Sequence, residues 1–142
     1  MTILKLALLG IFFLASFRVG ALDNDLSYGS IAERDAVMVK QLKDYAKQLS
    51  EQLPMMVDAE TQAFGVIALD KVMSFSFRFI NAVYNEVDVA TLKKTSLENL
   101  NAIACQDSKV KIWMDFGMSY NYIYYDKNNR IIARIPFTQY HC

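Results

Sequence analysis

Side chains that could carry out catalysis are scarce in this chain of 142 residues. It contains one histidine, His141, and two cysteines, Cys105 and Cys142. A Ser-His-Asp or Cys-His relay would have to use His141, the second-last residue, and that position is typical of an exposed terminal side chain. The sequence therefore predicts no catalytic residue, and we expect a protein that is not an enzyme.

Two loose pairs of carboxylates offer an alternative. Asp58 lies near Glu60 in the sequence, and Glu86 lies near Asp88. Paired acids can act as general acid and base, which leaves open a hydrolase of unrecognised type that uses Asp or Glu. Both pairs fall in predicted turns or helix starts, where acidic side chains stabilise helix N-termini. A structural role is therefore the favoured interpretation.

One polar turn has the residue types of a cation site. Asp126, Asn128 and Asn129 supply oxygen atoms of the kind that calcium prefers. The turn lacks the glycine and the distal glutamate of an EF-hand loop, and a hairpin turn uses the same residue types. The five glycines are scattered singly, so there is no glycine-rich phosphate loop. We predict no metal and no cofactor.

Tyrosines form the candidate binding surface. Tyr120, Tyr122 and Tyr124 alternate along a predicted strand and share one face, with Tyr125 beside them. Tyrosine is enriched at protein interfaces, so these residues could form a recognition surface. The alternative is that their rings fill the core while the hydroxyls reach its rim. The sequence does not fix which face of this strand is buried.

The two cysteines predict a disulfide. An even number of cysteines in an exported chain is typical of a structural bridge, here between Cys105 and Cys142. The chain-entropy model gives such a bridge a stabilisation of about 4 kcal/mol. There is no Cys-x-x-Cys motif, and His141 adjoins Cys142 in sequence only, so a reactive thiol is the less favoured alternative.

The N-terminus predicts a signal peptide over residues 1–21. Lys5 precedes an apolar run over 6–17, and small residues before Ala21 predict cleavage between Ala21 and Leu22. The run is shorter than the roughly 20 residues of a membrane-spanning helix. The alternative, an uncleaved anchor, would place Arg18 in the membrane at a cost. We therefore expect a periplasmic or secreted protein with no stable membrane insertion after cleavage.

The net charge of the chain indicates which classes of partner it can bind through electrostatic attraction. The whole chain has 15 basic and 15 acidic residues, and the predicted signal peptide carries Lys5 and Arg18 but no acid. The remaining chain is therefore slightly acidic, which excludes nucleic acid binding through bulk charge.

Hydrophobic periodicity predicts one α+β domain over residues 22–142, in the order α-β-β-α-β-β. Its antiparallel sheet is expected to pack against the helices. Apolar stripes predict helices, and alternation predicts strands, most clearly from Met73 to Phe79. The expected elements are a helix over 30–53, strands over 64–69 and 72–79, a helix over 88–105 with a shorter piece over 108–117, and strands over 119–125 and 130–137.

Short motifs through this domain resemble one family. They are the segment 53–58, the strand around Phe75, the segment 104–107, the tyrosine-rich segment 117–126 and the terminal Cys142. Together they are similar to the small exported bacterial proteins described as quorum-sensing-regulated virulence factors. The resemblance implies an exported α/β protein without an assigned enzymatic activity, linked to host or community interaction. It carries over no catalytic residue.

These observations favour a non-enzymatic exported bacterial protein that acts by binding another protein. An inhibitor of a hydrolase and an accessory factor are both members of this class. One alternative is a membrane-anchored component of an envelope or secretion assembly. The other is the hydrolase that uses its acids, which would need a pocket enclosing carboxyl groups of raised pKa. The sequence does not name the partner or the oligomeric state.

Overall fold

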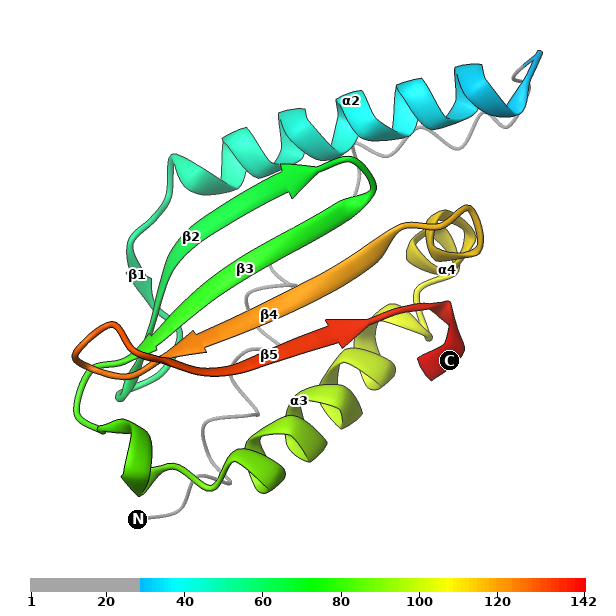
Figure 1. Cartoon of the computed structure of the whole chain (residues 1–142). Coiled ribbons are helices and arrows are strands. Elements are labelled where there is room, and N and C mark those ends of the chain that lie inside the picture. The colour runs from blue at the N-terminus through cyan, green and yellow to red at the C-terminus, as the bar shows by residue number, and fades with distance from the viewer. Residues whose placement is uncertain (1–28) are drawn as a thin grey trace.

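The computed structural model describes residues 29–142 (Figure 1). The predicted signal peptide and its cleavage site between Ala21 and Leu22 lie outside the described residues. The elements are, in chain order, α2 (Ile31–Ser50), β1 (Met55–Met56), β2 (Thr61–Leu69), β3 (Val72–Phe79), the 3-10 helix η2 (Tyr84–Glu86), α3 (Val89–Ala104), α4 (Ser108–Asp115), β4 (Ser119–Tyr125), β5 (Ile131–Phe137) and the 3-10 helix η3 (Gln139–His141).

Side-chain caps fix where the three α-helices begin. The Ser30 hydroxyl accepts a hydrogen bond from the Glu33 N–H at the start of α2. Asp88 caps α3 and Asp107 caps α4 in the same way, each accepting from N–H groups of the first turn. Such caps satisfy backbone donors that have no partner within the helix. The first helix ends at Ser50, whereas the sequence predicts that it continues to residue 53.

The five strands form one sheet in the order β1-β2-β3-β4-β5. The α+β class is as predicted, but the sheet is mixed and not wholly antiparallel, because β3 and β4 run parallel. The physical reason is the connection between them. The segment with α3 and α4 carries the chain back along the sheet, so β4 starts at the same end as β3. β5 is an edge strand, in keeping with Pro136.

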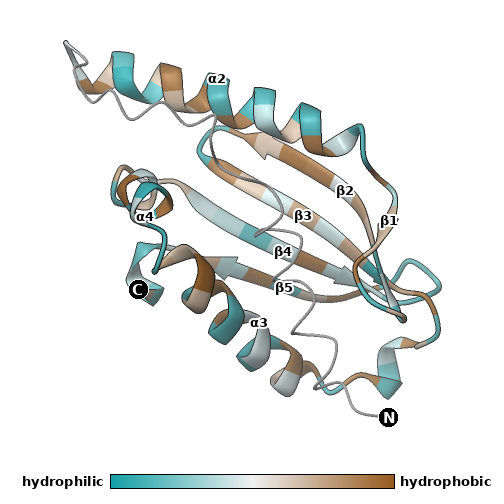
Figure 2. Ribbon diagram, turned by 180° about the vertical axis from the view of Figure 1, so that it is seen from behind, coloured by the Kyte–Doolittle hydropathy of each residue, from teal (hydrophilic) through white to brown (hydrophobic). Residues whose placement is uncertain are grey.

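The core lies on one face of this sheet. Met73, Phe75, Phe77 and Phe79 of β3 are buried, while the alternate residues of the strand are half-buried. α2 contributes a buried stripe that includes Leu42. α2 runs along the β2 side of the sheet and α3 along the β5 side (Figures 1 and 2). Within residues 29–142, no helix combines the length and the apolar character that crossing a membrane requires.

Candidate binding surface

Three of the four carboxylates considered for acid–base chemistry, those of Asp58, Glu86 and Asp88, accept hydrogen bonds from backbone N–H groups. One oxygen of Asp58 accepts hydrogen bonds from the N–H groups of Glu60 and Thr61, at 2.7 Å each. Glu86 accepts from the Val83 N–H at 3.0 Å, and the Asp88 carboxylate accepts from the Thr91 N–H at 3.1 Å. Each of these acids therefore closes a turn or begins a helix, as the favoured interpretation of the sequence has it.

Asp126, the leading residue of the possible cation turn, is buried at the end of β4. One of its oxygens accepts from the N–H groups of Asn128 and Arg130, at 2.8 Å each. The other accepts from the Tyr84 N–H at 3.0 Å and so ties η2 to the β4–β5 turn. Asn129 has a positive φ of 65°, which asparagine tolerates. Within residues 29–142, no group of three or more His, Cys, Asp or Glu side chains could hold a metal ion.

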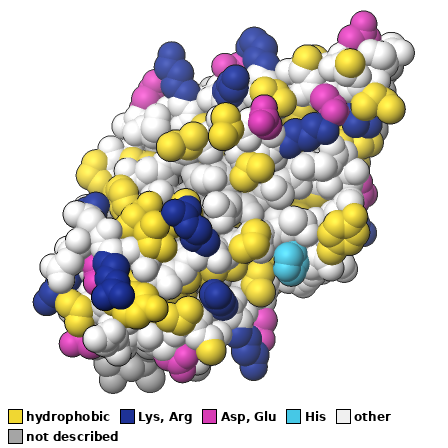
Figure 3. Space-filling view, in the orientation of Figure 1, with side chains coloured by type: hydrophobic (Ala, Val, Ile, Leu, Met, Phe, Trp, Pro, Cys, Tyr) yellow, Lys and Arg dark blue, Asp and Glu magenta, His cyan; other side chains and the backbone are white. Residues whose placement is uncertain are grey.

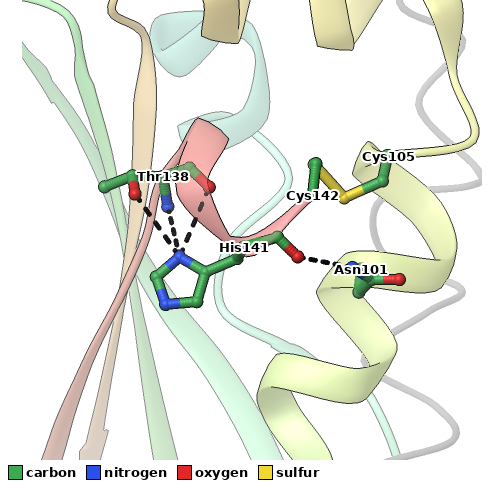
Figure 4. Close-up of a disulfide and its surroundings, with 5 residues drawn as sticks. All are labelled: Asn101, Cys105, Thr138, His141 and Cys142. Carbon is green, nitrogen blue, oxygen red and sulfur yellow. Dashed lines mark hydrogen bonds between the residues drawn. A yellow bond between two sulfur atoms is a disulfide. The ribbon is translucent and has the colours of Figure 1, made fainter.

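His141 helps to hold the last residues of the chain against β5 and α3 (Figure 4). Its Nδ1 accepts a hydrogen bond from the Thr138 N–H at 2.9 Å, and its ring stacks on Phe137 at a centroid distance of 5.0 Å. Its backbone carbonyl accepts from the Asn101 side chain at 2.6 Å. The next residue, Cys142, forms the predicted disulfide with Cys105, at a Cα–Cα distance of 5.4 Å. Helix α3 and the chain end are thus joined by two independent contacts.

The tyrosines of β4 do not share one exposed surface. Tyr120 and Tyr122 are buried, and Tyr122 meets the rings of Phe75 and Phe77 edge-on at 5.6 and 5.1 Å. Tyr124 stacks on Phe77 at 5.2 Å. These rings fill the core beneath the helices, which is the second of the two alternatives that the sequence left open.

The hydroxyl of Tyr124 lies at the edge of this core. It is 3.3 Å from the hydroxyl of Ser96 on α3, within hydrogen-bond distance. Burial raises the pKa of Tyr124 to about 12, and the hydrogen bond with Ser96 offsets part of that effect. Burial likewise raises the pKa of Tyr120 and of Tyr122. All three phenols therefore stay protonated at neutral pH.

Tyr125 lies on the other side of the sheet, in a cluster that the sequence analysis did not find. Its ring meets Phe64 edge-on at a centroid distance of 5.3 Å. The Arg78 guanidinium lies over the Phe64 ring, 4.3 Å from its centroid. Arg78 and Tyr125 are paired residues of β3 and β4, and Phe64 sits at a bulge in β2. The one available signal was that Arg78 is the charged residue on the polar side of an alternating strand.

We call the side of β2–β5 that carries this cluster the open face. Its side chains alternate with the buried ones, and the strand register aligns them in rows across the sheet. One row contains Ser76, Ile123 and Arg134. At the far end of β2, the open face presents Ile67 and Leu69, which are 68% and 69% exposed. Hydrophobic and basic side chains are interspersed on the face of the molecule that Figure 3 shows, with acidic side chains also visible on it.

The fold is found in three bacterial proteins of solved structure. The type II secretion system pilotin AspS from Vibrio cholerae is 16% identical, with a TM-score of 0.62 over 80% of this chain and 100% of that one. The type II secretion pilotin EpsS from Vibrio vulnificus is 16% identical, with a TM-score of 0.64 over 78% and 96%. This chain shares its fold with these two proteins.

The third structure is a Pseudomonas aeruginosa protein described as secreted. It is 15% identical, with a TM-score of 0.62 over 77% of this chain and 96% of that one. No family model matches the chain, and no curated protein matches it. The resemblance to the quorum-sensing-regulated virulence factors therefore stays a prediction, and the likeness to the three structures concerns the fold.

Proposed function

We propose that this chain is an exported, non-enzymatic accessory protein that binds a protein component of a type II secretion assembly. The observation that carries the proposal is the fold, which spans all or nearly all of two proteins described as pilotins of that system. This proposal takes the assembly role from the membrane-anchored alternative of the sequence analysis. The anchor of that alternative is the segment 1–21, which lies outside the described residues.

Two features of the chain support the proposal. The Cys105–Cys142 disulfide suits an oxidising compartment, because cytosolic thiols are kept reduced. Three of the four carboxylates that the hydrolase alternative requires, those of Asp58, Glu86 and Asp88, accept hydrogen bonds from backbone N–H groups. We place the protein in the periplasm, where it has access to the envelope machinery. An association with virulence is a further prediction from the family resemblance.

Deletion of the gene in the bacterium that encodes it tests the proposal. We expect release of a type II secretion substrate into the medium to fall several-fold and to recover when the full chain is supplied in trans. An unrelated periplasmic protein should stay out of the medium in both strains, which controls for leakage. Secretion that does not change, with no type II component co-purifying with the tagged chain, would overturn the proposal.

A further inference from the structure

We propose that the open face of the sheet docks an acidic, partly apolar segment of the protein partner. The inference depends on the proposed function in one respect, the identity of the assembly that supplies this partner. The binding surface itself is inferred from the charges, the ring contacts and the exposed apolar side chains of β2–β5.

The charge carried by the strands themselves has one sign. None of the five strands contains Asp, Glu or Lys, and their two charged residues are Arg78 and Arg134. Within residues 29–142, neither arginine forms an ion pair, and the acid that directly follows β2, Asp70, belongs to the β2–β3 turn. The two arginines lie two strands and one row apart, which places their Cα atoms about 12 Å apart. A segment with two separated carboxylates would complement them.

Arg78 is held ready for such a carboxylate. Its guanidinium is fixed over Phe64, and Phe64 is fixed in turn by Tyr125. Among residues 29–142, its side chain makes one long hydrogen bond, 3.4 Å to Gln62, and its buried Nε has no hydrogen-bond partner. An arginine stays charged at any physiological pH and can donate two parallel hydrogen bonds to a carboxylate. The Arg78 side chain is already ordered. It would therefore lose little conformational entropy when a ligand binds.

The apolar part of the surface favours a protein segment over an anionic lipid surface. Ile67 and Leu69 are exposed, and Ile123 lies half-buried between the two arginines. Aromatic residues and arginine are enriched in protein interfaces, whereas lysine, aspartate and glutamate are depleted. Anionic membranes are usually bound by clusters of lysine and arginine. The absence of lysine from the strands therefore points to a protein segment.

Photo-crosslinking in the encoding bacterium tests this inference. The full chain carries p-benzoylphenylalanine at position 67 on the open face or, as a control, at Lys93 on the exposed side of α3. We expect position 67 to crosslink to a peptide of another protein that contains at least two Asp or Glu residues. Arg78→Gln with Arg134→Gln should lower that yield by about tenfold or more. The matched change of two exposed charges, Lys93→Gln with Lys94→Gln, should leave the yield unchanged.

Arg134→Gln alone guards against a folding defect, because this exposed residue can change without disturbing the Phe64 cluster. Its yield should fall while the midpoint of urea unfolding stays the same. Crosslinks from position 67 to a second copy of this chain, to lipid, or to a neutral or basic segment would overturn the inference. So would an acidic segment whose capture ignores both arginines.

The same experiment separates this inference from the proposed function. An acidic segment of a protein outside the secretion assembly would support the open face as the docking surface and count against the proposed function. A secretion component captured from position 93 but not from position 67 would support the proposed function and count against the open face as the docking surface.

Discussion

Asp126 has a carboxylate that could serve as a metal ligand but accepts hydrogen bonds from backbone N–H groups instead. Its two carboxylate oxygens receive three backbone N–H donors, from Tyr84, Asn128 and Arg130. Burial by itself would raise the pKa of this carboxyl group. The three backbone hydrogen bonds and the nearby Arg130 charge outweigh that effect and hold the pKa below its ordinary value. The ionised form is therefore the one that the fold binds.

This shift predicts an acid-dependent stability. A carboxyl group with a lowered folded-state pKa stabilises the fold fully above its unfolded pKa, about 3.9. That contribution is lost as the pH falls below this value and through the folded-state pKa. We expect Asp126→Asn to be less stable than the wild type at pH 7 and the difference to shrink by pH 2–3. Urea unfolding at both pH values measures it, and a difference independent of pH would contradict the assignment.

At the scale of elements, β3 and β4 act as one aromatic layer. Their parallel register places Phe75 beside Tyr122 and Phe77 beside Tyr124. Two rings of β4 on this side each meet two rings of β3: Tyr122 contacts Phe75 and Phe77, and Tyr124 stacks on Phe77 and Phe79. Such ring pairs contribute beyond their buried area. The layer explains why a tyrosine-rich strand lies within the core.

The two sides of β4 should differ sharply in their sensitivity to truncation. Tyr122 is 5% exposed and touches two phenylalanine rings, so Tyr122→Ala should lower the free energy of unfolding by about 3–5 kcal/mol. Tyr125 lies half-buried on the open face, and Tyr125→Ala should cost about 1 kcal/mol. Urea unfolding of the two variants gives the comparison. Equal losses would show that β4 does not have one buried and one open side.

The limits of the sequence are clearest in this same strand. Strict alternation from Met73 to Phe79 was enough to identify the buried side of β3. β4 carries Ile123 and Tyr125 opposite its other tyrosines, so both sides look apolar and periodicity cannot choose between them. The parallel pairing of β3 with β4 depends on the path of α3 and α4, and the Arg78–Phe64–Tyr125 cluster joins three strands. Both are non-local, and no local pattern encodes them.

At the scale of the molecule, the disulfide links the end of α3 to Cys142 and closes a loop over the second half of the domain. The loop that it closes spans 37 residues and contains α4, β4 and β5. Those two strands supply Ile123, Tyr125 and Arg134 to the open face as well as half of the aromatic layer. The bridge therefore restrains both the core and the proposed docking surface.

Removing the bridge should weaken the domain without changing its fold. Closing a loop of this length reduces the conformational entropy of the unfolded chain, and the chain-entropy model gives about 4 kcal/mol. We expect Cys105→Ser with Cys142→Ser to lower the free energy of urea unfolding by roughly that amount. Wild-type protein unfolded in the presence of a reductant should show the same loss, and the reductant should leave the double variant unaffected. If the double variant were as stable as the wild type, the packing of Phe137 and His141 and the Asn101 hydrogen bond would suffice to hold the C-terminus on α3.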